Sequence, residues 1–229
     1  MTRKAIGILG AMQVEVEMLI TRLKNKQTYE YAGCTYYAGE LEGTPVVIAT
    51  CGIGKVCAAC RTQAMLDHFD IRAVINTGIA GGMQPDLSPC DIVISTDVVY
   101  HDMYGIEHEE LVPAMPADPA LRAAAEKACA ALDQGKSRYY SGRIASGDQF
   151  IADSRMKAEI LAAHHPFCVE MEGAAIAHCC TMNQMPFVVI RTISDNADDH
   201  AEFNYNAFEV EAANISAAIV CKMLSYHAF

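Results

Sequence analysis

The sequence predicts a single α/β domain with three layers, in which a mixed β-sheet is flanked by helices. Short apolar segments of strand length alternate with longer helical segments over most of the 229 residues. Two strands near residues 35–50 are joined by a tight turn at 42–43, which adds antiparallel pairing to the sheet. Since no linker, repeat or low-complexity segment divides the chain, we expect one domain over residues 1–229.

The first half of the chain supplies strands at 5–9, 35–41, 44–50 and 73–77, which are apolar and rich in β-branched residues. Helices are predicted at 13–24 and 55–69, the second rich in Ala and Cys. Glu15 lies in the first turns of the first helix, where a carboxylate favours the positive end of the helix dipole. Glycine turns follow several of these strands, at 7–10, 52–55 and 76–82.

The second half continues the alternation. A Val/Ile-rich strand at 91–100 is followed by the longest irregular stretch, residues 101–117, and a loop of that length is usually functional or an interface. Asp118 and Pro119 open a helix at 118–132 as N-cap and first residue. Further strands are expected at 139–145 and 187–193, with helices at 154–163, 173–182 and 209–226.

The composition is globular and excludes several classes of partner. Hydrophobic residues make up 52% and charged residues 20%, and the net charge is −11. That charge argues against nucleic acid and anionic membranes as partners. No apolar segment approaches the roughly 20 residues that a membrane span needs.

The ten cysteines lie mostly in apolar segments, and no secretory signal is recognisable. We therefore expect a cytoplasmic protein whose cysteines are reduced and buried. Cys57 and Cys60 form the one CxxC pair, but no second pair or nearby histidine stands at metal spacing, so we predict that they pack in the core. His164 and His165 precede a proline at a helix end, and residues 198–200 form an acidic loop, so we expect no metal.

Two carboxylates stand out in residues 169–195. Glu172 precedes an Ala-rich helix, and Asp195 follows the buried strand 187–193. Because ligands of open α/β sheets bind beyond the carboxyl ends of the strands, we expect both carboxylates in one crevice. Each could instead be a local charge: Glu172 and Glu15 as helix-dipole partners, and Asp195 as a turn cap. Met12, Met171 and Phe150 would ordinarily be core residues.

Taken singly, the glycine turns are weak evidence. Residues 52–55 fail as a P-loop, because no glycine stands at the required upstream position and Val56 replaces Ser or Thr. The joint pattern is specific, since six motifs occur in a fixed order at 10–15, 52–56, 76–82, 146–150, 169–174 and 191–195. This set resembles the 5′-methylthioadenosine/S-adenosylhomocysteine nucleosidases of the purine nucleoside phosphorylase superfamily, over residues 4–224.

The resemblance implies a nucleoside phosphorylase-like fold, no cofactor, and a homodimer with residues 101–113 at the partner's site. It implies hydrolysis of the bond between adenine N9 and ribose C1′ in methylthioadenosine, adenosylhomocysteine and 5′-deoxyadenosine. Glu15 would activate water, Glu172 would hold the ribose hydroxyls, and Asp195 would protonate adenine N7. The matching substrate-binding positions are Met12, Ile53, Ile79, Ala80, Gly81, Phe150, Ile151, Glu170, Met171, Arg191, Ser194 and Tyr205.

The chemistry needs these residue types. Cleavage of an N-glycosidic bond builds oxocarbenium character on the sugar, which carboxylates stabilise. A base and an acid on opposite sides of the bond activate water and the leaving group, as in inverting glycosidases. A buried aspartic acid keeps its proton toward neutral pH because desolvation raises the pKa of a carboxyl group.

Three features leave the preferred 5′ substituent of the substrate undetermined. Ile79 stands where the family that the chain resembles often has a small polar residue, Tyr205 stands where that family usually has Phe, and the 101–116 loop is short. We expect adenine to be required and several 5′-thio groups to be accepted. Three alternatives remain: a phosphorylase of the same superfamily, a nucleosidase for a deoxyfutalosine-type substrate, and a non-catalytic nucleoside-binding module. The phosphorylase would need an arginine-built anion site, and none of the nine arginines lies in the Gly10 turn.

Overall fold

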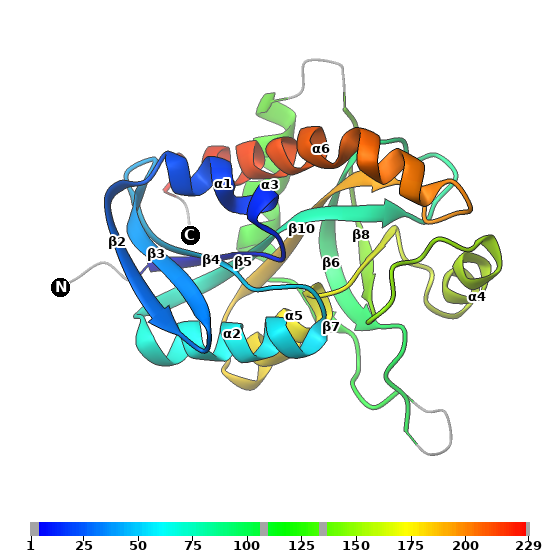
Figure 1. The fold of residues 1–229 in the computed structure, drawn as a ribbon, viewed down its shortest axis with the longest axis horizontal. Coiled ribbons are helices and arrows are strands. Elements are labelled where there is room, and N and C mark those ends of the chain that lie inside the picture. The colour runs from blue at the N-terminus through cyan, green and yellow to red at the C-terminus, as the bar shows by residue number, and fades with distance from the viewer. Residues whose placement is uncertain (1–4, 106–109, 133–136, 228–229) are drawn as a thin grey trace.

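A mixed sheet forms the centre of the molecule (Figure 1). The computed structural model describes residues 5–105, 110–132 and 137–227, and ten strands within those ranges join into this sheet. The strands are β1 Ala5–Gly10, β2 Lys24–Tyr31, β3 Cys34–Leu41, β4 Thr44–Thr50, β5 Ile71–Gly82, β6 Ile92–Tyr100, β7 Met115–Pro116, β8 Tyr139–Ser146, β9 Cys168–Glu170 and β10 Phe187–Asp195.

Part of the sheet closes on itself. The pairing runs β10-β6-β8-β9-β5, and β10 also pairs with β5, so these five strands form a ring. From β5 the sheet continues as an open wing in the order β1-β4-β3-β2, in which the last two pairings are antiparallel. Strands β4, β1, β5 and β10 all run parallel, so their carboxyl ends meet at one edge.

Helices cover both faces of the sheet. They are α1 Gln13–Thr21, α2 Lys55–His68, α3 Pro119–Leu132, α4 Ser154–His164, α5 Gly173–Met182 and α6 Ala201–Leu224. Helices α1 and α3 pack against α6 on one side, α2 packs against α5 on the other, and α4 lies apart at the end of the molecule (Figure 1). The predicted α/β class with a mixed sheet between helices is confirmed.

Burial explains why the central strands read as continuous apolar runs. All nine residues of β10 are buried, because this strand has neighbours on both sides and helices on its faces. At the edge of the open wing, β2 is almost entirely exposed and polar, so it has no apolar pattern by which it could be predicted. Helix α1 consequently ends at Thr21 rather than at 24, since β2 begins at Lys24.

Two further boundaries differ from the prediction. Residues 76–82 were expected to form a glycine turn, but they continue β5 as far as Gly82. Helix α6 begins at Ala201, eight residues before its predicted start. Two short strands were not predicted from the sequence. Strand β7 lies within the irregular stretch 101–117 and pairs with β6, and strand β9 precedes α5.

The cysteine prediction was correct for seven of the ten side chains and wrong for the CxxC pair. All ten cysteines are free, and Cys57 and Cys60 lie exposed on α2, while Cys90 is half-buried. These two cysteines occupy the face of α2 that points away from the sheet, so helical spacing alone did not reveal which face is inward. None of the described helices is long and apolar enough to cross a membrane.

Candidate active site

A cavity of about 460 Å³ opens at the carboxyl ends of β1, β5 and β10. Its walls come from the turn between β1 and α1, the end of β5, the segment after β8, the start of α5, and the first turns of α6. The parallel strands bring these segments together, although they are spread over nearly two hundred residues of sequence.

Fourteen of the fifteen residues predicted for the site line this cavity, and Ile151 lines a recess of about 30 Å³ beside it. The residues in the main cavity are Met12, Glu15, Ile53, Ile79, Ala80, Gly81, Phe150, Glu170, Met171, Glu172, Arg191, Ser194, Asp195 and Tyr205. Sequence reasoning missed Ala11, Val169, Glu202 and Asn206. The last two lie one helical turn apart on α6, on either side of Tyr205, and that spacing could have indicated them.

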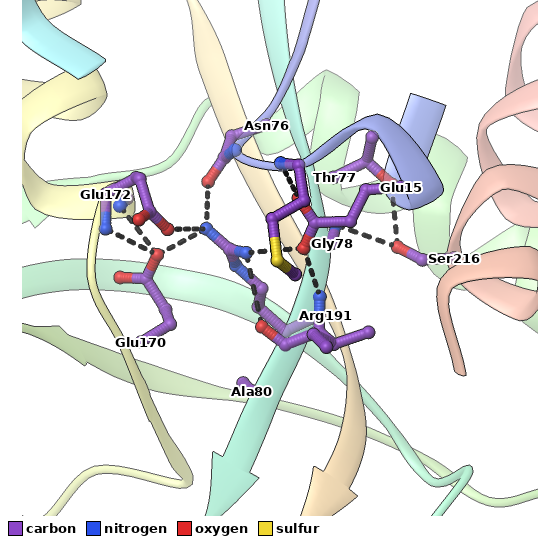
Figure 2. Close-up of polar contacts among 12 residues, drawn as sticks. Glu15, Asn76, Thr77, Gly78, Ala80, Glu170, Glu172, Arg191 and Ser216 are labelled. Atoms are coloured by element: carbon purple, nitrogen blue, oxygen red, sulfur yellow. Dashed lines mark hydrogen bonds and ion pairs between the residues drawn. The ribbon is translucent and has the colours of Figure 1, made fainter. Parts of the chain in front are cut away.

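Arg191 organises the charges at the floor of the cavity (Figure 2). Its side chain is 1% exposed and comes from the middle of β10. The guanidinium forms ion pairs with Glu170, with Glu172 at 3.5 Å and with Glu15 at 3.7 Å. It also donates to Asn76 Oδ1 at 2.7 Å. One buried cation therefore holds three carboxylates from three different elements.

Glu15 lies in the first turn of α1 and is 1% exposed. One carboxylate oxygen accepts a hydrogen bond from Met12 N–H at 2.9 Å, and the other accepts from Ile79 N–H at 3.0 Å. Burial raises the pKa of Glu15, although the Arg191 guanidinium and these N–H donors oppose the rise. The carboxylate thus caps its own helix and also faces the cavity.

The close approach of Glu15 to β5 explains the glycine at position 78. A Cβ atom at Gly78 would lie 2.3 Å from Glu15 Oε1 and 2.5 Å from Arg191 Nη1, so any larger residue would displace the pair. Ser216 of α6 fixes the same stretch by accepting from Gly78 N–H at 3.2 Å and by bonding the Thr77 hydroxyl at 2.7 Å (Figure 2). Glycine is therefore required for close packing inside a strand and not for a turn.

Glu170 and Glu172 differ in their surroundings. The Glu170 carboxylate accepts from Glu172 N–H at 3.0 Å, from Gly173 N–H at 2.7 Å, and from Ser146 Oγ and Arg191. Its partners are all protein groups, so it caps α5 and neutralises Arg191. Glu172 accepts from Gly54 N–H at 2.9 Å. Burial and the neighbouring Glu170 raise the pKa of Glu172 to about 8.

Asp195 ends β10 and is 1% exposed. Its carboxylate accepts from Ser194 Oγ and from Ala197 N–H, both at 2.8 Å. Burial raises the pKa of Asp195, and the nearby Asp198 adds to the rise, while the two hydrogen bonds and Lys157 oppose it. Asp195 is therefore held in one orientation and keeps its proton to higher pH than an exposed aspartate.

Aromatic side chains cover the opposite side of the cavity. The rings of Phe150 and Tyr205 meet edge to face with centroids 5.7 Å apart, and Phe150 is 46% exposed. The Tyr205 hydroxyl donates to Glu209 at 2.9 Å and lies 3.4 Å from the Met12 sulfur. The hydroxyl of Tyr205 is thus paired within the protein. Ile79 turns its side chain against α6 and offers only its backbone to Glu15.

The lining is rich in carboxyl groups. Glu15, Glu170, Glu172, Asp195 and Glu202 line the cavity, and Arg191 is the only basic residue among the described residues that do so. Within the same described ranges, no cluster of three or more His, Cys, Asp or Glu side chains has the geometry of a metal site. Such a site is suited to proton transfer and to stabilising positive charge on a bound ligand.

Comparisons with known proteins agree with this geometry. Residues 5–225 match the phosphorylase superfamily. A 5′-methylthioadenosine/S-adenosylhomocysteine nucleosidase from Chromohalobacter salexigens is 42% identical, and the match covers 96% of this chain and 97% of the relative.

Two solved structures are similar over more than nine tenths of their length. A nucleosidase of the same name from Colwellia psychrerythraea, in complex with adenine, has a TM-score of 0.91 and 38% identity, covering 96% of this chain and 94% of that one. Futalosine hydrolase of Helicobacter pylori has a TM-score of 0.89 and 28% identity, covering 97% and 98%. With 42% identity over nearly the full length of both chains, the protein belongs to the 5′-methylthioadenosine/S-adenosylhomocysteine nucleosidases of the phosphorylase superfamily.

Proposed function

We propose that this protein hydrolyses the N-glycosidic bond of 5′-methylthioadenosine and S-adenosylhomocysteine, and also of 5′-deoxyadenosine, and releases adenine and the 5′-substituted ribose. The observation that carries the proposal is the placement of Glu15, Glu172 and Asp195, all buried, around one cavity. The name of the relative from Chromohalobacter salexigens and the adenine bound by the Colwellia enzyme support the choice of substrate.

Each carboxylate has a distinct role in the proposed reaction. Glu15 takes a proton from water as the water oxygen bonds to ribose C1′, and its raised pKa makes it a stronger base than an exposed glutamate. Asp195 gives its proton to adenine N7 as the bond between C1′ and N9 breaks. Glu172 accepts hydrogen bonds from the ribose hydroxyls. Solvent then returns the proton from Glu15 to Asp195, so the enzyme is regenerated.

The lining of the cavity favours hydrolysis over phosphorolysis. A phosphate ion would have to enter a cavity lined by five carboxyl groups, and Arg191 is already engaged by three of them. A developing oxocarbenium ion is positive and is stabilised by the same carboxylates. We therefore propose water and not phosphate as the nucleophile.

A deoxyfutalosine-type nucleoside is the second candidate substrate. The likeness to futalosine hydrolase favours it, because the same three carboxylates would serve that reaction. Cleavage of an N-glycosidic bond is common to both candidates, and the group at C5′ differs.

The proposal is tested by incubating the purified protein with methylthioadenosine, adenosylhomocysteine, 5′-deoxyadenosine, methylthioinosine and a deoxyfutalosine-type nucleoside, and measuring the free base by chromatography. We expect adenine from the first three and little hypoxanthine from the inosine analogue. Release from the deoxyfutalosine-type compound alone would establish the second candidate. Binding of the nucleosides without release of any base would establish the non-catalytic alternative.

A homodimer is also proposed. Ile53 and Phe150 line the cavity yet are 57% and 46% exposed, and Val56 at the start of α2 is 74% exposed. These exposed apolar residues continue the open side of the cavity, which a second copy would cover with its residues 101–113. Residues 106–109 of that loop lie outside the described residues. Sedimentation at micromolar concentration should give twice the 24.8 kDa chain mass, and Val56→Asp should lower it toward one chain.

The ten free cysteines support a reducing compartment, and we propose the cytoplasm.

A further inference from the structure

The lysine of the glycine turn at 52–55 has no part in the reaction described so far. Lys55 is the first residue of α2, and its ammonium lies 2.5 Å from Asp102 Oδ1 and 3.4 Å from Asp148 Oδ2. Two backbone contacts complete the group: Lys55 N–H donates to Asp148 Oδ1 at 2.9 Å, and Asp148 N–H donates to Asp102 Oδ2 at 2.8 Å. Lys55, Asp102 and Asp148 are called the charged triad below.

The charged triad joins three segments that are far apart in the sequence. Lys55 follows the turn before α2, Asp102 begins the segment after β6, and Asp148 belongs to the segment after β8. Ile53 and Phe150, each two residues from a member of the triad, form half-exposed walls of the cavity. The triad therefore links two walls of the cavity without lining it.

The same turn also touches the catalytic group directly. Gly54, immediately before Lys55, donates its N–H to Glu172 Oε1 at 2.9 Å. Gly54 has φ of 90°, and an added Cβ atom would lie 3.2 Å from Asp148 Oδ1, so the turn is pressed against the triad. The turn that carries Lys55 therefore also carries the wall residue Ile53 and the N–H donor to Glu172.

The pair formed by Lys55 and Asp102 is more sheltered than a surface ion pair. The Lys55 side chain is 15% exposed and that of Asp102 is 28% exposed, and the ammonium lies 5.6 Å from the centroid of the Tyr100 ring. Burial would raise the pKa of Asp102, but the Lys55 ammonium and Asp148 N–H overcome that effect and lower it. The Asp102 carboxylate therefore stays charged and paired with Lys55 near neutral pH.

We infer that Lys55 is a positioning residue for the proposed nucleoside hydrolysis, acting through Asp102 and Asp148 to hold the walls formed by Ile53 and Phe150. This inference rests on the proposed function. Apolar walls contact the substrate alike before and during bond cleavage, so loosening them raises KM and changes kcat less. A side chain that only stabilised the fold would change neither constant in the folded protein.

The test compares Lys55→Met with Arg22→Met. Arg22 also forms an ion pair of 2.5 Å, with Glu42, but at the end of α1, and it does not line the cavity. We expect Lys55→Met to raise KM for methylthioadenosine by about three- to tenfold, the net size of one lost hydrogen bond of ordinary strength, with kcat within about twofold. Arg22→Met should leave both constants unchanged.

Two more variants separate positioning from folding. Lys55→Arg keeps the cation and should recover most of the wild-type KM. The double variant of Lys55→Met with Asp102→Asn should have nearly the KM of Lys55→Met alone, because the two residues act as one unit. If Lys55→Met unfolds, Asp148→Asn takes its place, since Asp148 is the most exposed member at 51%, and the same rise in KM is expected.

An unchanged KM in Lys55→Met would overturn the inference, and so would additive effects in the double variant. A wild-type protein that releases no base would overturn the proposed function and this inference together. The two failures are distinguishable, because only the first occurs in an active enzyme.

Discussion

Replacement of Arg191 by methionine should be the most damaging single change to this fold. Methionine keeps much of the volume of the side chain but removes the charge. Glu15, Glu170 and Glu172 would then face one another in the interior without a cation, and Asn76 would lose its donor. Removing one partner of a buried ion pair typically costs about 3–5 kcal/mol in the free energy of unfolding.

That loss predicts a large shift in the melting temperature. For a chain of this size, 1 kcal/mol corresponds to about 2–4 °C, so Arg191→Met should melt roughly 6–20 °C below wild type. Arg22→Met is the matched control. Its ion pair with Glu42 is largely exposed, with Arg22 at 49%, and such pairs contribute only about 0–1 kcal/mol.

The deficit should also depend on pH, with a definite sign. Arg191 lowers the pKa of both Glu15 and Glu172, so its removal raises both further above the ordinary value of 4.5. A carboxyl group with a raised pKa in the folded state destabilises that state as it loses its proton. The stability of Arg191→Met should therefore fall as pH rises from about 5 through 8, where Glu172 titrates in the wild type.

Urea unfolding followed by circular dichroism at pH 5, 7 and 8.5 measures this directly for wild type and both variants. We expect the smallest deficit at pH 5 and the largest at pH 8.5. A loss below about 1 kcal/mol at neutral pH, or a deficit that grows toward acid pH, would refute the placement of Arg191 as the cation that holds three buried carboxylates.

Three further predictions concern turnover. Asp195→Asn should stay folded and lose about 10²–10⁴ in kcat, the usual contribution of a positioned acid, and a near-normal kcat would remove it from the mechanism. Burial, and to a smaller extent Asp198, raise the pKa of Asp195, so kcat/KM should fall as pH rises through that pKa. Asp198→Asn should move this fall in the pH profile to lower pH. Asp199→Asn changes an exposed neighbour and should leave the profile unchanged. Tyr205→Phe removes a hydroxyl already paired with Glu209, so steady-state kinetics should show its preference among 5′-thio groups changed by less than about tenfold, within what an apolar contact supplies.

The sequence predicted four of the five strands of the ring, β5 only in part, because their burial leaves a clear pattern, and it missed the three-residue strand β9. Strand β10 and the helix after Glu172 stand out as apolar and Ala-rich runs, and their ends place two of the three carboxylates. Strand β2 could not be found in this way, since it holds its place through backbone pairing with β3 and buries almost no side chain.

Contacts between distant residues explain the remaining differences at the site. The glycine at position 78 resembled a turn residue, but its small size admits Glu15 and Arg191 from other elements. Glu170 is predicted to bind substrate and does line the cavity, and the structure adds contacts with Arg191 and with the first turn of α5 that no local pattern indicated. Local sequence patterns do not indicate partners that are distant in the sequence, so such contacts can be identified only once the fold is known.

The most direct measurement of the central claim is the phosphate dependence of adenine release from methylthioadenosine. The purified enzyme is assayed in phosphate-free buffer and again with added phosphate, and both products are identified by mass spectrometry. Water activated by Glu15 predicts equal rates and a free methylthioribose in both cases. A requirement for phosphate, with accumulation of the sugar 1-phosphate, would contradict hydrolysis and establish a phosphorylase.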